Sequence, residues 1–487
     1  MLAALLLGFS ARYSANAPLG AWQNQLLGQD VWREFDPGSY YVATAHELAG
    51  GEPPLFVGHP GAPLVLALYG VQRAYYGMAG SAQLSFLEFA ARHLPDIFVL
   101  SKLLVSLLHL ASFAGLYAFA RALLRSESAA CLAVLGYATS LPVLYYLSRI
   151  SVEPLVMLAF FAAFLCLWRY QDLARAGRTR AAWGFVALAA ASAASGAVAK
   201  LHQLGPLPAF LLVVLLADRS APRLAWRTRL GDALVFCATS AVVLLAWSQL
   251  IDWGRFFAYW TSVKPTGSVA APLTGFAALL VCESAFTALG LFGWLAFLRR
   301  HPECRARLAW PSLYAGLALL PFAYRVVFWG GYLPFHYLFV TGGFLAVFAG
   351  DALPRVMPRL SLPTGGVRGA LAALGCVGLL HATAIYAVVD SRHRDALQYA
   401  ANRAVYSEIA ALGPAQHLGV AGQRPETRLR LPWLHTIPFR GSRLRIAFEA
   451  LFVPLGPGAA RPDAQRLFVP ALGTAIVPPP PPGEPTR

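Results

Sequence analysis

Long apolar runs, separated by short arginine-rich loops, are the feature of this sequence that most limits how it can fold. A hydrocarbon core about 30 Å thick needs roughly 20 apolar residues for each helical crossing. Of the 487 residues, 57% are hydrophobic and only 13% are charged, which excludes a soluble enzyme, a disordered chain and a fibrous protein. The sequence therefore predicts an all-α polytopic membrane protein. Eleven apolar runs are candidate crossings, at residues 1–13, 97–121, 129–147, 154–170, 182–199, 204–217, 230–250, 272–298, 308–328, 334–350 and 369–389.

The charges in the loops predict how the chain is oriented. A further apolar stretch, residues 60–76, is interrupted by prolines and by Arg73. If this stretch does not cross, the loops on one side carry 17 Arg, whereas the short loops on the other side carry five Lys or Arg. Cytoplasmic loops are the ones enriched in Lys and Arg, so the Arg-rich side is predicted to be cytoplasmic. Residues 60–76 then form a juxtamembrane helix within a long first periplasmic loop, residues 14–95.

The formal net charge of +16 does not by itself indicate a nucleic-acid partner. Such a partner requires basic residues gathered into one patch with stacking aromatics, whereas here they are spread over the loops. The six cysteines are also scattered, without a CxxC pair, which argues against a structural zinc site. We therefore expect membrane lipids as surroundings, no nucleic acid, and no required cofactor.

The composition changes after Val389, where charged residues return. We divide the chain into a membrane domain (1–389), a small soluble periplasmic α+β domain (390–477) and a Pro-rich disordered tail (478–487). Strands are expected at 417–421, 442–448 and 465–469. One amphipathic helix is indicated by apolar residues that recur every three to four positions before Gly413-Pro414, namely Leu397, Ala401, Val405, Ile409 and Leu412.

Ionisable residues collect at the predicted outer ends of the crossings. Such residues are costly near a bilayer and are therefore candidates for function. Carboxylates can take a proton from a hydroxyl, and cations can bind a phosphate. The residue types and their position predict a site at the outer membrane surface, formed by Asp36, His59, Arg149, Glu153, Lys200, His202 and Arg325.

Four segments resemble the GT-C glycosyltransferases, which include the protein O-mannosyltransferases and the bacterial transferase that attaches aminoarabinose to lipid A. Asp36-Pro-Gly-Ser-Tyr40-Tyr41, followed by Gly58-His59-Pro60, resembles the first extracytoplasmic loop of that family. Glu153-Pro154 at the start of an apolar helix resembles the family's second acidic position. The segment from Ser195 to Lys200 resembles its Gly…Thr-Lys segment, and the stretch from Arg325 to Pro334 is similar to its Arg-Tyr-…-Pro run. The resemblance covers roughly residues 1–350.

The resemblance implies a GT-C-type bundle and a sugar donor carried on a polyprenyl phosphate. Transfer to an acceptor hydroxyl, on a lipid, a glycan or a protein, would take place on the periplasmic face of a bacterial inner membrane with inversion at the anomeric carbon. The expected roles are catalysis for Asp36 and Glu153, binding of the donor phosphate for Lys200, His59, Arg325 and Arg149, and lining of the substrate site for Tyr40, Tyr41 and His202.

Other interpretations of the same residues remain open. Asp36 precedes Pro37 and a glycine, which is equally typical of a turn, and Glu153 precedes a proline, which is typical of a helix start. Several relatives have a second acid where this chain has Pro37, and the aminoarabinose enzyme has Lys where this chain has His59. A divalent metal between Asp36 and Glu153 is compatible with the sequence but is not indicated by it. A flippase for lipid-linked sugars and a non-catalytic GT-C-like scaffold are the alternative functions.

Overall fold

The structure is a computed structural model, and the part of the chain that it describes consists mainly of helices. The described residues are 2–16, 38–49, 61–80, 83–147, 149–217, 226–262, 270–321, 335–360 and 366–412, together with 418–420, 444, 447, 451–454 and 467–468. The helices, in chain order, are α1 (Leu2–Asn16), α2 (Gly38–Ala49), α3 (Ala62–Ala79), α4 (Phe86–Arg92), α5 (Leu94–Leu124), α6 (Glu127–Ala138), α7 (Leu141–Tyr146), α8 (Glu153–Arg175), α9 (Thr179–Ala199), α10 (Leu201–Leu204), α11 (Leu207–Ala217), α12 (Trp226–Ser248), α13 (Trp253–Ser262), α14 (Ala270–Arg300), α15 (Arg305–Leu317), α17 (Phe339–Val356), α18 (Gly366–Leu380) and α19 (Ala382–Ala410).

Several helices are long and apolar enough to span a membrane. Among the described residues there are five, namely α5, α8, α9, α12 and α17, and six if the bent pair α18 and α19 counts as one span. The prediction of a helical membrane protein is therefore confirmed, while the number of eleven crossings stays a prediction. Helix α3, which covers most of the stretch 60–76, is not among these spans, and its interfacial position also stays a prediction.

Some of the predicted crossings are not continuous helices. The run 129–147 is divided into α6, which ends at Ala138 and is followed by the cap residue Thr139, and α7, which has Pro142 in its first turn. Proline has no backbone N–H to donate, so it is tolerated at the start of a helix but not inside one. The run 369–389 is bent by 66° between α18 and α19. Furthermore, α19 continues to Ala410. The helix predicted between Leu397 and Leu412 is therefore present up to Ala410, as the end of one long helix that begins at Ala382, while the domain boundary at 389 stays a prediction.

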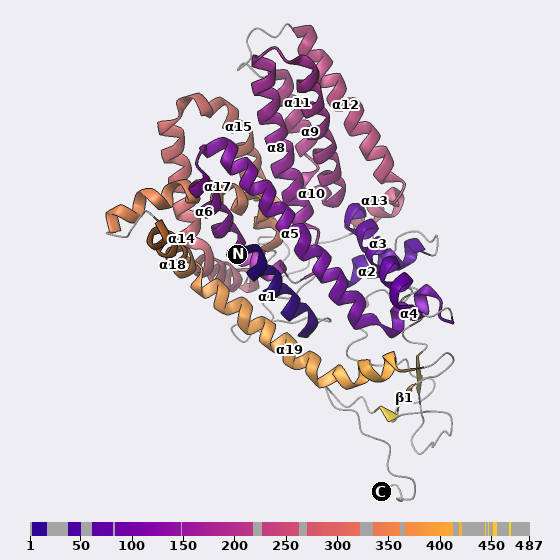
Figure 1. Cartoon of the computed structure of the whole chain (residues 1–487). Helices are drawn as coiled ribbons and strands as arrows, with labels where there is room; N and C mark the ends of the chain where they lie inside the picture. Colours follow the sequence, from indigo (N-terminus) through magenta and orange to yellow (C-terminus); the bar gives the residue numbers. More distant parts are fainter. Residues whose placement is uncertain are drawn as a thin grey trace, which may run out of the picture.

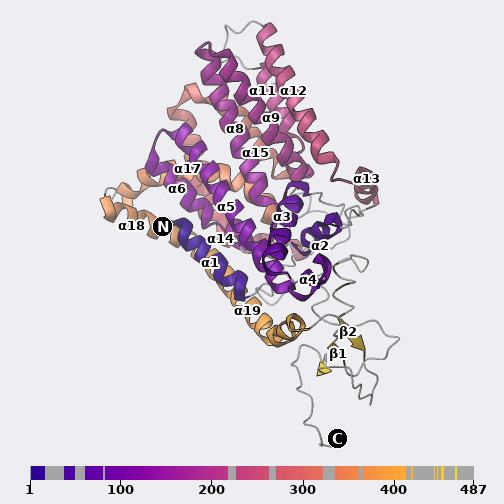
Figure 2. The ribbon, with the colours of Figure 1, turned by 45° about the vertical axis from the view of Figure 1, so that its right-hand side comes forward.

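The helices pack closely where small residues meet. Figures 1 and 2 show α8, α9, α11 and α12 side by side in the upper half of the molecule, and α19 along the opposite end. A Cβ added at Gly293 of α14 would lie 2.2 Å from the carbonyl oxygen of Phe348 in α17. A Cβ added at Gly196 of α9 would lie 2.6 Å from the Cβ of Ala159 in α8. Membrane helices approach closely at such residues because there is no side chain between the backbones.

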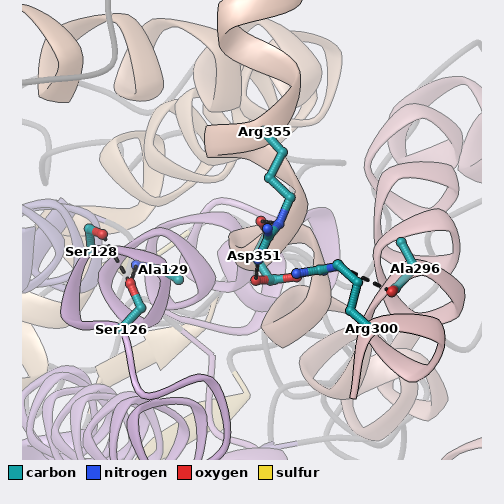
Figure 3. Close-up of polar contacts among 7 residues, drawn as sticks. All are labelled: Ser126, Ser128, Ala129, Ala296, Arg300, Asp351 and Arg355. Atoms are coloured by element: carbon teal, nitrogen blue, oxygen red, sulfur yellow. Dashed lines mark hydrogen bonds and ion pairs between the residues drawn. The ribbon is translucent and has the colours of Figure 1, made fainter. Parts of the chain in front are cut away.

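An ion-pair cluster joins the ends of α14 and α17 (Figure 3). Asp351 accepts hydrogen bonds from Arg300 of α14 and, at 2.6 Å, from Arg355 of its own helix. Nearby, the hydroxyl of Ser126 caps α6 by accepting from the backbone N–H of Ala129 at 3.3 Å. The loops 299–307 and 351–368 were expected on the same side of the membrane, and this contact brings their ends together.

The first-loop helices pack against the end of the chain's last long helix. A buried apolar cluster contains Val65 of α3, Ala90 of α4, Val152 and Leu412. A guanidinium N–H of Arg92, at the end of α4, donates to the carbonyl oxygen of Leu412. As a result, α2, α3 and α4 are held next to the segment that leads into α8.

A small sheet follows α19. Strands β1 (Leu418–Val420), β2 (Phe452–Pro454) and β3 (Leu467–Phe468) are all parallel, in the order β2-β1-β3. The strands predicted at 417–421 and 465–469 are confirmed. The one at 442–448 is wrong: Leu444 and Ala447 are helical, and both contact the apolar cluster at a helical spacing of three. The solvation and the location of this segment stay predictions, and residues 478–487 lie outside the described residues.

Candidate active site

The segment from the end of α7 to the first residue of α8 contains two of the predicted site residues, Arg149 and Glu153. Pro154 lies in the first turn of α8, where its missing N–H costs nothing, and Glu153 lies beside it, where the helix dipole favours a carboxylate. The carbonyl oxygen of Leu147 accepts hydrogen bonds from Ser106 of α5 at 2.8 Å and from Ser10 of α1 at 3.3 Å. These contacts from two other helices fix the turn that presents Arg149 and Glu153.

Lys200 and Glu153 form a fully buried ion pair. Lys200 ends α9 and begins α10, so its side chain leaves the chain at a break between helices. Its Nζ donates to Oε1 of Glu153, and both side chains are 0% exposed. The ring of Tyr337 lies 5.2 Å from the same Nζ and adds a cation–π contact. The packing of α8 on α9 therefore brings together two charges that are 47 residues apart.

The second oxygen of Glu153 is a buried polar atom without a hydrogen-bond partner among the described residues. Within the described residues, no hydrogen-bond partner is present for Oε2 of Glu153, the hydroxyl of Tyr137 or the hydroxyl of Ser151, and all three atoms are buried. A buried carboxylate oxygen without a donor is unfavourable unless a ligand or water supplies one. This oxygen is therefore suited to accept a hydrogen bond from a substrate hydroxyl.

Two arginines contact the ring of Tyr145 in α7. The guanidinium carbon of Arg149 lies 4.2 Å from the ring centre, and that of Arg392 in α19 lies 5.7 Å from it. Arg392 also donates to the carbonyl oxygen of Tyr145. Both arginines are buried. The sequence analysis missed Arg392, although a signal exists: it is the first basic residue after the run 369–389, as Arg149 is after 129–147 and Lys200 is after 182–199.

Comparisons with known proteins identify the fold. No model of a known protein family and no curated protein matches the chain. Among solved structures, ArnT from Cupriavidus metallidurans bound to undecaprenyl phosphate is similar, with a TM-score of 0.52 and 15% identity over 93% of this chain and 89% of that chain. The apo structure of the same protein gives a TM-score of 0.54 at 15% identity, over 93% and 88% of the two chains.

The chain shares the fold of ArnT. This finding confirms, at the level of the fold, the resemblance drawn from the four sequence segments. With 15% identity, the likeness concerns the arrangement of helices and not the chemistry of individual side chains.

The structure describes some of the other predicted site residues. Asp36, His59 and Arg325 lie outside the described residues, and of His202 only the backbone, in α10, is described. Tyr41 is buried, and a Cβ added at Gly61 would lie 2.5 Å from its ring and 3.3 Å from Val152. The φ of +53° at Gly61 favours glycine in any case.

The contact between Tyr41 and Gly61 places α2 close to the start of α8. This helix begins two residues after Asp36 and is packed, through Gly61, against the residue that precedes Glu153. Tyr40 is half-buried on the same helix. The expected roles of Tyr40 and Tyr41 in lining the substrate site stay predictions. In the described part of the chain there is no group of three or more His, Cys, Asp or Glu side chains that could hold a metal ion.

Proposed function

We propose that this protein is a glycosyltransferase that moves a sugar from a polyprenyl-phosphate donor to an acceptor hydroxyl on the periplasmic face of a bacterial inner membrane. The observation that carries the proposal is the buried Glu153–Lys200 pair, at helix ends of a fold shared with ArnT, with Arg149 in the segment just before Glu153. That relative was solved with undecaprenyl phosphate bound. A site that combines a carboxylate with several cations suits a substrate that has both sugar hydroxyls and a phosphate.

The proposed reaction is a direct displacement at the anomeric carbon. Asp36 accepts the proton of the acceptor hydroxyl while the acceptor oxygen forms its bond to the anomeric carbon. The bond from that carbon to the phosphate oxygen breaks, and its electron pair leaves with the lipid phosphate. Attack from the side opposite the leaving group inverts the anomeric configuration. His59, Arg325 and Arg149 are proposed to neutralise the negative charge that grows on the phosphate.

Glu153 and Lys200 have linked roles in this proposal. Oε2 of Glu153 accepts a hydrogen bond from a sugar hydroxyl, because its other oxygen is bound to Lys200. An ammonium group carries three N–H donors, so contact with Glu153 and contact with a phosphate oxygen are compatible. Lys200 therefore connects the part of the site that binds the sugar to the part that binds the phosphate.

The test is a transfer assay on the purified protein in nanodiscs with a panel of radiolabelled polyprenyl-phosphate sugars. Removal of the base should lower turnover, so Asp36→Asn should lose roughly 10²-fold or more in rate while undecaprenyl phosphate still binds. Asp252→Asn is the matched control, because Asp252 accepts from the backbone N–H of Arg255 at the start of α13. We expect it to transfer at the parental rate.

Two other results would contradict the proposal. Transfer by Asp36→Asn at the parental rate would show that Asp36 is not the base. Movement of labelled donor across the bilayer without release of the sugar would instead indicate a flippase.

A further inference from the structure

We propose that Glu283 of α14 and His381, at the bend between α18 and α19, form a proton-dependent latch on the start of α7. With His381 protonated, this pair holds the break between α6 and α7 against the bend between α18 and α19. Loss of the proton leaves the carboxylate without its cation and releases the start of α7. The latch is a property of the fold, and only its effect on sugar transfer rests on the proposed function.

Glu283 has a partner for each of its two oxygens. Oε1 accepts a hydrogen bond from the backbone N–H of Leu141, the first residue of α7. A first-turn N–H has no acceptor in its own helix, and the side chain of the preceding residue, Ser140, does not cap α7. Oε2 lies 3.6 Å from Nε2 of His381. One carboxylate therefore connects the start of α7 to the bend between α18 and α19.

The other nitrogen of His381 contacts the end of α6. Nδ1 lies 3.0 Å from Oγ1 of Thr139, the cap residue that follows α6. The same hydroxyl lies 2.9 Å from the carbonyl oxygen of Leu135, to which it can donate. The ring of His381 also packs on the ring of Phe286, one turn after Glu283, with 4.5 Å between their centres. His381 is thus in contact with both α6 and α14.

The number of hydrogens that these contacts require indicates the protonation state of His381. A hydroxyl has one hydrogen, and a neutral imidazole has one N–H. If Thr139 donates to Leu135, Nδ1 must donate to Thr139, and Nε2 of a neutral ring would present a lone pair to the carboxylate. All three contacts are favourable together only when one more proton lies between Nε2 and Oε2. We assign it to the imidazole, because an imidazole is more basic than a carboxylate.

Burial makes the two charges depend on each other. The side chain of His381 is 0% exposed, and that of Glu283 is 13% exposed. A buried charge that loses its partner is strongly unfavourable. When the imidazole becomes neutral at higher pH, the carboxylate of Glu283 keeps only the N–H of Leu141 in a site with little water. It is then better placed in solvent, and its contact with α7 is lost.

Other ionisable groups lie on the helices around the pair. Helix α14 packs against α17, α18 and α19, α18 also packs against α6, and α19 packs against α1 and α7. In the described part of the chain, none of their ionisable side chains forms a hydrogen bond or an ion pair with Glu283 or His381. The ones closest along the chain are Tyr137 of α6, Tyr145 of α7, Cys376 of α18 and Tyr386 of α19, while α1 carries Arg12 and Tyr13, and α17 carries Asp351 and Arg355, which bind each other.

Helix α7 connects the latch to the candidate site. Arg149 and Glu153 follow this helix in the chain. The carbonyl oxygen of Tyr145, near the end of α7, accepts from Arg392 of α19, and α19 begins at the residue after His381. The latch therefore acts on α7 at its start and, through α19, near its end. A change at the bend should move the segment that carries the two candidate site residues.

The first experiment measures the protonation of His381 by solid-state nuclear magnetic resonance of isotope-labelled histidine. The sample is the full-length protein in nanodiscs at about pH 6.5, where a free imidazole is half protonated, and the loss of a signal in His381→Gln assigns it. We expect an imidazolium in the parent and a neutral ring in Glu283→Gln, whose amide oxygen still accepts from Leu141. A neutral His381 in the parent, or the same protonation in both proteins, would overturn the latch.

An exposed pair of the same kind provides the matched control. Nδ1 of His301 lies 3.2 Å from Oε1 of Glu303, and both side chains are exposed to solvent. Glu303→Gln removes the same carboxylate charge from a histidine partner without touching α7. We expect Glu303→Gln to behave like the parent in every measurement.

The second experiment measures opening by hydrogen exchange of the α7 amides, corrected for the intrinsic rate at each pH. In the parent, exchange should become roughly 10-fold faster or more between about pH 6.5 and about pH 9. Glu283→Gln has no charge to release and should stay protected at both pH values. His381→Gln leaves the carboxylate without a cation and should exchange fast at both. The same pH dependence in the parent and in Glu283→Gln would show that there is no latch, whether or not His381→Gln folds.

A third measurement separates the latch from the proposed function. Over the same pH range, the rate of sugar transfer by the parent should fall roughly 10-fold more than that of Glu283→Gln, because a small displacement of site residues is costly in rate. An equal fall in both proteins would show that the latch does not act on the site. If the parent transfers no sugar from any donor, the proposed function fails, and the resonance and exchange results still decide on the latch.

Discussion

Replacement of Lys200 by methionine should destabilise this protein more than most single substitutions. Methionine keeps much of the length of the side chain, so the change removes the charge and leaves the carboxyl group of Glu153 without its partner in a site where both side chains are 0% exposed. Loss of one partner of a buried pair costs about 3–5 kcal/mol. Two unit charges about 4 Å apart interact by roughly 4 kcal/mol at an effective dielectric constant of 20, which agrees with that range. Because both side chains are fully buried, solvent does not screen the interaction between them.

The double variant makes the prediction specific to the pair. Glu153→Gln combined with Lys200→Met removes both charges, and the remaining buried polar groups are neutral. We expect the double variant to be more stable than Lys200→Met alone, because no charge remains without its partner. If the changes in the free energy of unfolding of the two single variants add up to that of the double variant, the two side chains do not interact.

The assay is reversible unfolding in mixed micelles. The loss of helix is measured by circular dichroism as the fraction of denaturing detergent increases. Thermal midpoints of the detergent-solubilised variants provide an independent order of stability. A loss below about 1 kcal/mol for Lys200→Met would refute the argument, since this is the range of an exposed pair.

Three further predictions concern other parts of the fold. Burial lowers the pKa of His46 to about 3 from 6.5, so below pH 6.5 the unfolded chain binds a proton that the folded protein does not. Stability should therefore fall by up to about 1.4 kcal/mol per pH unit from pH 6.5 towards pH 3, and His46→Phe should make the melting temperature less dependent on pH. Gly293→Ala should cost about 1–3 kcal/mol in the same unfolding assay, because the new methyl group would meet the backbone of α17, whereas Gly184→Ala, with nothing within 4 Å, should not. Cysteines introduced at Ser220 and His301 should react with a labelling reagent only from the cytoplasmic side; labelling from the periplasm would contradict the charge-based orientation.

Much of the helical framework could be predicted from the sequence, because an apolar run in a bilayer must satisfy its backbone hydrogen bonds within a helix. For this reason α5, α8, α9, α12 and α17 coincide with predicted crossings. The bend between α18 and α19 could not be predicted in the same way. The run 369–389 has no proline, and the bend occurs at His381, which contacts Thr139 at 3.0 Å and Glu283 at 3.6 Å. Both partners come from helices far away in sequence.

In the candidate site, single residues could be recognised from the sequence, but the contacts between them could not. Glu153 and Lys200 could be recognised as candidates because each is an ionisable residue at the end of an apolar run. Their direct pairing depends on the close approach of α8 and α9 at Gly196, which is a tertiary contact. Arg392 was missed because the domain boundary was placed at 389, inside what is one continuous helix.

Some of the buried polar residues in this bundle lie where the helices are interrupted, and this gives a physical reason for the location of the candidate site. At the break between α6 and α7, the backbone N–H of Leu141 has no acceptor in its own helix and instead donates to the carboxylate of Glu283. Lys200 likewise lies at the break between α9 and α10. Interrupted helices in a membrane need polar side chains to satisfy the freed backbone groups, and such breaks are tolerated only where protein or water surrounds them. The interruptions that reduce the regularity of this fold are therefore also the places where charged groups can be kept, as the proposed binding of a phosphate and a sugar requires.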